Sequence, residues 1–269
     1  MAYKIGFEVE YPENKSAEST LTVPQTNNPR RSLVQVYFPA RNASYTYYND
    51  SYDLKKGDMV YVDGKLEGLL GRVTDVNYNF KIKISDYKRV IALVNTNVSG
   101  RFYMAGSHFV TFDPMALPAE KARSWFKAPA KEEDEFVSGR DDTVFLLNDL
   151  KGINISGAAA ERGHDYYLEN RVKYVCVDGT CGYAIVEGRE AYEVEFEYRN
   201  GEISGLVCSC FCSQNCKHVF AAMLQLKETL DLIEKHYTEE YRSGYFAAVC
   251  KGTMFTKAID GKETGSFVL

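Results

Sequence analysis

The chain carries little net charge of either sign for its length. It has 32 lysines and arginines against 37 aspartates and glutamates, so its formal charge is -5 over 269 residues. The summed field of such a protein repels phosphate and does not attract nucleic acid from a distance. Any contact with nucleic acid therefore has to come from a local basic patch.

Long apolar segments are also missing. The first residues, Met1-Ala2-Tyr3-Lys4, lead into a polar stretch without the apolar core of a signal peptide. No later run is both long enough and sufficiently free of charge to cross a bilayer. We therefore expect a cytoplasmic protein that contacts no membrane.

The cysteines do not have the pattern of a disulfide framework. There are seven, an odd number, and four of them crowd into residues 208–216. Such clustering is typical of metal capture in a reducing compartment. Cys176 and Cys181 flank the turn Asp178-Gly179, and we interpret them as core residues of a hairpin. A cross-strand disulfide or a second metal pair is the alternative.

No familiar catalytic motif occurs in the sequence. The glycines at 64, 68 and 71 do not form a phosphate loop, because no Lys-Ser/Thr pair follows them. His164 stands beside Asp165 but has no nucleophile partner in the sequence. We therefore predict that the protein is not an enzyme and that it has no catalytic residues.

Aromatic residues are in surplus, with 20 tyrosines and 15 phenylalanines. This surplus favours β-structure. Short alternating runs joined by Gly, Asn and Asp turns lie between residues 32 and 112, and they predict a β-rich, barrel-like domain over residues 1–112. The run Leu54–Val62, with Gly68 and Gly71-Arg72-Val73 after it, resembles the hairpin of small β-barrel domains.

The rest of the chain indicates an α+β fold. Residues 113–140 are rich in proline and charge and predict a linker. Residues 141–235 combine two expected hairpins, at 172–186 and 192–208, with an amphipathic helix from about 216 to 234. Residues 236–269 are expected to form a C-terminal extension.

The most informative motif is Cys-x-Cys-x5-Cys-x-His, formed by Cys208, Cys210, Cys216 and His218. Side chains alternate along a strand, so the first two sulfurs point the same way and the intervening Ser209 points away. Cys216 and His218 then begin the following helix and close a tetrahedron. Three thiolates and an imidazole are the ligands of a closed structural zinc site. The motif therefore predicts Zn²⁺ that folds the chain and does not catalyse.

Residues from about 160 to 226 resemble the SWIM zinc-finger family. The resemblance includes the ligand motif and the upstream segments Arg162–Tyr167, Asn170-Arg171-Val172, Val186-Glu187-Gly188 and Tyr192-Glu193-Val194. It implies a SWIM-type zinc module that binds DNA or protein, often beside a helicase-like ATPase. Cys212 departs from the pattern; it is either a small buried loop residue, which the family register favours, or an alternative ligand.

Basic residues interleave with tyrosines in the expected N-terminal domain. Basic and aromatic side chains on a small β-domain can hold a phosphate backbone and stack bases. The alternative is that the tyrosines face the core and the lysines keep the domain soluble. The candidate nucleic-acid contacts are Arg30, Arg31, Lys55, Lys56, Lys81, Lys83, Lys88 and Arg89.

Together, these features predict a zinc-stabilised binding protein associated with nucleic acid. It would bind DNA itself or recruit and regulate a helicase-like ATPase. The alternative is a protein–protein interaction adaptor without direct nucleic-acid contact, favoured by the acidic total and the amphipathic helix after His218.

Overall fold

The small sheet is built from the alternating segments that begin at residue 32. In the computed structural model, which describes residues 29–130, 143–210, 212 and 215–259, five antiparallel strands pair in the order β2-β1-β4-β3-β5. Along β1, Val34, Val36 and Phe38 are buried and alternate with more exposed residues, so one face of the strand packs into a core. The strands are β1 Ser32–Phe38, β2 Ala43–Asn49, β3 Met59–Val62, β4 Gly71–Asn77 and β5 Val90–Val94.

The small sheet is open and does not close as a barrel. β2 and β5 are its two edges, and within the described residues only an isolated bridge between Tyr48 and Arg89 joins them. Alternation and turn residues mark each strand locally. Closure depends on pairing between edge strands that are distant in sequence, for which the chain carries no local signal. The β-rich prediction is confirmed, and the barrel-like closure is corrected to an open sheet.

The large sheet has eight strands in the order β6-β7-β13-β9-β10-β11-β12-β8. All its pairings are antiparallel. It includes both expected hairpins. Its strands are β6 Tyr103–Ala105, β7 His108–Thr111, β8 Phe145–Leu146, β9 Val172–Asp178, β10 Cys181–Glu187, β11 Ala191–Arg199, β12 Glu202–Cys208 and β13 Tyr245–Cys250.

The large sheet draws its strands from three of the expected segments. β6 and β7 belong to the segment 1–112, and β13 belongs to the expected extension 236–269, yet β13 lies between β7 and β9. The sheet therefore crosses the expected segment boundaries, because the partners of a strand are chosen in space and not along the chain. Residues 1–28, 131–142 and 260–269 of those segments lie outside the described part.

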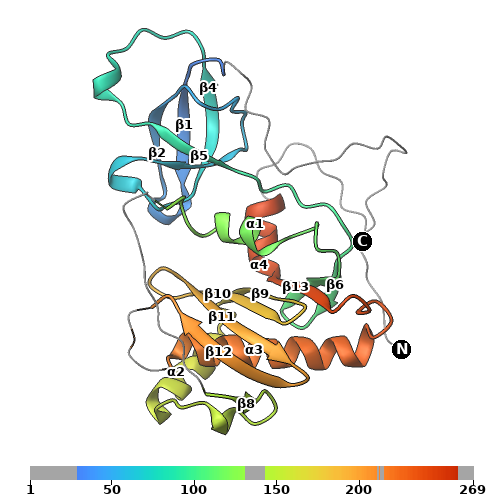
Figure 1. The fold of residues 1–269 in the computed structure, drawn as a ribbon. Coiled ribbons are helices and arrows are strands. Elements are labelled where there is room, and N and C mark those ends of the chain that lie inside the picture. Colours follow the sequence, from blue (N-terminus) through green and yellow to red (C-terminus); the bar gives the residue numbers. More distant parts are fainter. Residues whose placement is uncertain (1–28, 131–142, 211, 213–214, 260–269) are drawn as a thin grey trace.

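The main helices lie on the two faces of the large sheet (Figure 1). The long helix α3 Lys217–His236 packs against one face, and α2 Gly157–Leu168 packs against α3. On that side, Val219, Met223 and Leu226 of α3 are buried with strand residues such as Val175. α1 Ala119–Ser124 and α4 Lys251–Met254 lie on the opposite side, between the two sheets (Figure 1). None of the described helices has the length and apolar character needed to cross a membrane.

Shorter helical turns complete the described structure. The 3-10 turns are η1 Pro39–Arg41, η2 Gly64–Leu66, η3 Ile84–Asp86 and η4 Leu150–Gly152, and a π-helical turn, Phe255–Ile259, follows α4. Ser156 caps α2, because its hydroxyl accepts a hydrogen bond from the Ala159 backbone N–H. The expected helix at about 216–234 is present as α3.

A second core joins the two sheets around the single tryptophan. Trp125 follows α1 and is fully buried, and its Nε1–H donates to the Asn95 carbonyl oxygen at 2.9 Å. Met59 and Tyr61 of the small sheet and Tyr174 of the large sheet belong to the same core. The described part of the expected linker therefore includes a helix and a core residue, and it packs between the sheets.

Candidate metal centre

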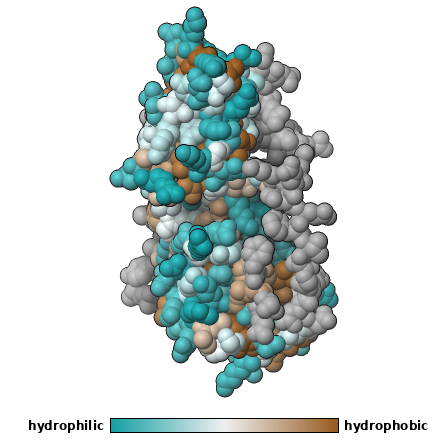
Figure 2. Space-filling model, turned by 90° about the vertical axis from the view of Figure 1, so that its left-hand side faces the viewer, coloured by the Kyte–Doolittle hydropathy of each residue, from teal (hydrophilic) through white to brown (hydrophobic). Residues whose placement is uncertain are grey.

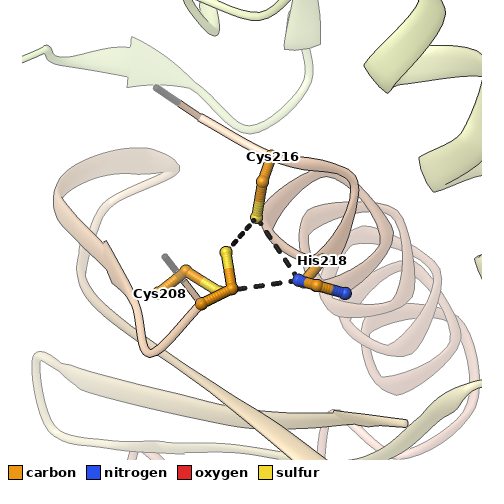
Figure 3. Close-up of side chains that lie close together, drawn as sticks. Cys208, Cys216 and His218 are labelled. Carbon is orange, nitrogen blue, oxygen red and sulfur yellow. Dashed lines mark hydrogen bonds between the residues drawn. The ribbon is translucent and has the colours of Figure 1, made fainter. Parts of the chain in front are cut away.

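The four residues of the Cys/His motif meet where β12 ends and α3 begins. β12 delivers Cys208, and its pairing with Val194 of β11 fixes the position of that strand end. Ser209 continues the contact, because its N–H donates to the Glu193 carbonyl oxygen and its hydroxyl accepts from the Glu193 N–H. Figure 3 shows the side chains of Cys208, Cys216 and His218 pointing toward one another from the two elements.

The ligand atoms have the separations of a four-coordinate site. The Cys210 and Cys216 sulfurs are 3.4 Å apart, and His218 Nδ1 lies 3.5 Å from the Cys216 sulfur and 3.8 Å from the Cys208 sulfur. All four ligand atoms lie within 4.8 Å of one another. A tetrahedron with metal–sulfur bonds of about 2.3 Å and a metal–nitrogen bond of about 2.0 Å has edges of about 3.5–3.8 Å. The cluster could therefore hold one metal ion.

The pKa values of the three thiols show which of them resist losing a proton when no cation is bound. Hydrogen bonds, first of all with Cys208, lower the pKa of Cys216. The same contact raises the pKa of Cys208, and burial raises the pKa of Cys210. One thiolate forms readily, whereas the second and third are opposed by burial and by the charge of the first. A bound cation removes that opposition, because it favours the deprotonated form of every ligand.

His218 is held in place by aromatic stacking and by a close backbone approach. The ring of Tyr192 stacks on the imidazole with a centroid separation of 4.1 Å and an interplanar angle of 18°. At Gly188, in the turn between β10 and β11, a Cβ atom would lie 2.9 Å from the Tyr192 ring and 3.2 Å from His218 Nε2. A side chain at this position would therefore press on both rings. Gly188 and Tyr192 form the outer cover of the imidazole.

Tyr166 of α2 forms a second aromatic contact beside the centre. Its ring lies 5.7 Å from the His218 ring, and both Lys217 and Arg171 place their cationic groups over it, at 4.5 and 4.7 Å. Gly163 allows this approach of α2 to α3, since a Cβ there would lie 2.8 Å from the Phe220 Cβ. The segments that carry the SWIM resemblance thus converge on the Cys/His cluster. The sequence pointed to these segments but not to their contacts with the imidazole.

The comparisons with known proteins add no relative. A scan of the chain against protein-family models found no match, and searches of curated proteins and of solved structures found none. The interpretation of the centre therefore rests on the chemistry and geometry of its own residues.

The remaining cysteines do not join the cluster. Cys212 is exposed, and among the described residues the group that could hold a metal ion consists of Cys208, Cys210, Cys216 and His218. Cys176 is buried in the core between the sheets, where burial raises its pKa to about 11, whereas Cys181 is exposed. Both are free thiols, as is the buried Cys250.

Two histidines, His164 and His108, lie apart from the Cys/His cluster. His164 is exposed on α2, and its ring lies 6.2 Å from that of Tyr167. His108 is fully buried, with Nε2 2.8 Å from the Val172 carbonyl oxygen and Nδ1 2.9 Å from the Ser107 hydroxyl. These contacts suit a neutral imidazole whose Nε2–H donates to the carbonyl. Burial lowers the pKa of His108 to about 4.

All eight basic residues singled out for nucleic-acid contact are exposed, but they differ in their partners. Lys56 pairs with Asp75 at 3.1 Å and Arg89 with Asp50 at 2.8 Å. Among the tyrosines interleaved with them, Tyr47 and Tyr48 are buried, which fits the core alternative for those two. The eight residues, Arg30, Arg31, Lys55, Lys56, Lys81, Lys83, Lys88 and Arg89, all belong to the small sheet and its connections.

Proposed function

We propose that this chain is a non-enzymatic, zinc-stabilised binding protein that associates with nucleic acid. The observation that carries the zinc part is the convergence of three sulfurs and one imidazole nitrogen within 4.8 Å. Zn²⁺ is the ion that this donor set suits best, because soft thiolates and imidazole in a closed tetrahedral arrangement are typical of structural zinc. Cys208, Cys210, Cys216 and His218 Nδ1 would hold the ion.

The proposed role of zinc is to close the connection between β12 and α3. Cys208 and Cys210 come from one side of this connection and Cys216 and His218 from the other, and only Cys216 and His218 are buried. Cys208 and Cys210 are only partly buried, so metal ligation would add the folding free energy that fixes this segment. The SWIM resemblance supports this proposal, since the residues that carry it surround the cluster.

The nucleic-acid part of the proposal is supported by the exposure of the basic candidates. They are confined to the small sheet and its connections, so a local patch can act although the formal charge of the chain is -5. By the same resemblance, the protein would recruit or regulate a helicase-like ATPase. In the second candidate function, a protein–protein adaptor, the acidic total and the long helix α3 would serve a protein partner alone.

The experiment is a salt series. Purified zinc-loaded protein is titrated against labelled DNA and labelled RNA, with the Cys216→Ser variant beside it. Binding through phosphate contacts weakens steeply and linearly in log–log form as salt rises. Negligible binding at every salt concentration contradicts direct nucleic-acid association and favours the adaptor. A helicase-like partner is tested separately, by crosslinking and capture in the native host.

A further inference from the structure

The connection between β4 and β5, residues 78–89, is a basic surface loop that the small sheet holds at both ends. Phe80 packs edge-on against Tyr48, with ring centroids 6.3 Å apart. At the other end, the Lys88 carbonyl oxygen accepts from the Tyr48 N–H, and the Arg89 N–H donates to the Asp63 carboxylate. The 3-10 turn η3 lies between these anchors. In Figure 1 the connection arches over one end of the small sheet, far from α2 and α3.

The lysines of this loop carry their charge without a carboxylate partner. Lys81, Lys83 and Lys88 are exposed, and no ion pair involves them in the part of the chain that the structure describes. Lys56 and Arg89, by contrast, are engaged by Asp75 and Asp50. Lys81 and Lys83 are exposed on either side of Ile82, which is half-buried. The loop also carries the exposed carboxylate of Asp86, whose Oδ1 accepts from the Ser85 hydroxyl, so its three lysines and Arg89 leave it with a net positive charge on an acidic protein.

An exposed aromatic stack stands at the start of the same connection, where Tyr78 follows β4 directly. The Arg30 guanidinium carbon is 4.1 Å from the centroid of the Tyr78 ring, and Tyr78 keeps 36% of its surface exposed. A guanidinium at this distance over a ring face makes a cation–π contact. Arg31 follows directly and is also exposed. Among the described residues, Tyr78 thus joins an exposed ring and a cation in one unit that lies outside the core.

We propose that this surface binds single-stranded nucleic acid. It consists of Arg30, Tyr78, Lys81, Lys83 and Lys88, which we call the loop platform. A base stacks on the Arg30–Tyr78 unit, and the lysines contact neighbouring phosphates. The proposal rests on the proposed nucleic-acid association and specifies which form of nucleic acid is bound and where.

The aromatic component favours a single strand over a duplex. In a duplex the base faces are already stacked on one another, so an exposed ring on a basic loop gains nothing from them. An unpaired base offers its face to Tyr78 or to the guanidinium plane of Arg30. Lysines alone would bind any polyanion, including an acidic peptide. The exposed Arg30–Tyr78 stack therefore favours a single strand over both a duplex and an acidic peptide.

The test uses zinc-loaded full-length protein and fluorescence anisotropy. The probes are a labelled single-stranded oligonucleotide, its duplex, and polyglutamate as a competitor. We expect the single strand to bind more tightly than the duplex, and polyglutamate to compete poorly. Tyr78→Leu should weaken single-strand binding by about fivefold to hundredfold, the range for loss of one base–aromatic stack. Tyr78→Phe keeps the ring and should retain the affinity.

Charge variants provide the matched control. The double variant Lys81→Glu and Lys83→Glu should reduce the salt slope by about two and weaken single-strand binding at least tenfold. The double variant Lys151→Glu and Lys235→Glu makes the same charge change at exposed positions of the large-sheet region, and it should bind nearly as the parent does. Circular dichroism of each variant checks that the fold is retained.

The outcomes separate this inference from the proposed function. Duplex binding as tight as single-strand binding, full affinity in Tyr78→Leu, or equal losses in the two charge variants each overturns the loop platform while nucleic-acid association stands. Equal competition by polyglutamate also overturns it, because the surface would then respond to charge alone. Failure of every nucleic acid to bind overturns both.

Discussion

The two ends of the molecule order their irregular segments by different means. At the metal end, the connection from β12 to α3 brings three thiols and an imidazole together. At the loop-platform end, the connection from β4 to β5 is held by an aromatic contact and backbone hydrogen bonds, with Phe80 on Tyr48 and Arg89 on Asp63. In the proposed function, the first segment depends on a bound ion, whereas no group of metal ligands is found at the second among the described residues. Removing the ion should therefore disturb one end before the other.

The surfaces at the two ends also differ in their use of charge. Near the metal centre, Arg171 pairs with Glu169 at 2.5 Å and Lys173 with Glu187 at 3.0 Å, and Lys217 lies over the Tyr166 ring at 4.5 Å. On the loop platform, the lysines face solvent. Figure 2 shows one face of the molecule, on which hydrophilic surface is interspersed with hydrophobic patches from one end to the other. Ion pairs thus occur at both ends, and the loop platform is distinguished by its three lysines that have no ion pair among the described residues.

The largest effect is expected from loss of a metal ligand. Cys216→Ser should reduce the bound zinc from one ion per chain to almost none and destabilise the metal end by several kcal/mol, because metal ligation and local folding are linked. Metal content after dialysis and thermal unfolding measure this. Cys212→Ser is the control, since Cys212 is exposed and outside the cluster. Zinc loss in Cys212→Ser and not in Cys216→Ser would contradict the ligand assignment.

The next effect concerns the core that joins the two sheets. Trp125→Ala should lower the free energy of unfolding by about 3–5 kcal/mol, the usual result of truncating a fully buried large side chain. Because Trp125 packs with residues from both sheets, the two regions should then unfold in separate transitions. Because Trp125 is the single tryptophan of the chain, denaturant unfolding of the variant is followed by tyrosine fluorescence and by circular dichroism. A single, unshifted transition would show that the sheets are not coupled through this core.

A smaller effect is expected at the cover of the metal-centre imidazole. Gly188→Ala would place a Cβ 2.9 Å from the Tyr192 ring and 3.2 Å from His218 Nε2, which should destabilise the region by about 1–3 kcal/mol through overpacking. Zinc release to a chelator should therefore be faster. Gly157→Ala is the control, because a Cβ there meets nothing within 4 Å. Equal release rates in the two variants would place the cover elsewhere.

The stability of the large sheet should depend on pH through the buried imidazole of His108 in β7. Burial lowers the pKa of His108 from 6.5 to about 4, so the unfolded chain binds this proton more readily. The stabilising contribution is complete above pH 6.5 and is lost as the pH falls toward 4, with a slope of at most about 1.4 kcal/mol per pH unit. His108→Asn should flatten the slope in that window. Unfolding at several pH values, at equal zinc content, measures it, and an unchanged slope refutes the assignment.

Local patterns predicted much of this structure. The spacing of Cys208, Cys210, Cys216 and His218 identified the cluster because its residues lie within one strand-to-helix connection, where sequence distance limits spatial distance. The amphipathic spacing of residues 216–234 predicted α3, because that pattern too lies within one short stretch of the sequence. The polarity of Lys81 and Lys83 predicted that they are exposed. It did not predict that they have no ion pair, because that depends on where the carboxylates of other segments lie.

The features that the sequence did not predict are non-local. β13 pairs with β7 and β9, which precede it by more than 60 residues in the chain. The small sheet is open because its edge strands β2 and β5 form no ladder with each other among the described residues. Trp125 was placed in a linker because proline and charge surround it, yet its indole fills the core between the sheets. Gly188 and Tyr192 belong to segments on which the SWIM resemblance was based, but their contact with His218 requires the turn between β10 and β11 to fold back over α3.

Hydrogen exchange measured by mass spectrometry tests the central comparison most directly. The full-length protein is compared with zinc, after zinc removal, and with zinc plus a single-stranded oligonucleotide. We expect zinc removal to accelerate exchange in residues 186–226 more than in residues 32–94, and the oligonucleotide to slow exchange in residues 78–89. Equal acceleration in both regions, or protection by the oligonucleotide only around the Cys/His cluster, would contradict this expectation.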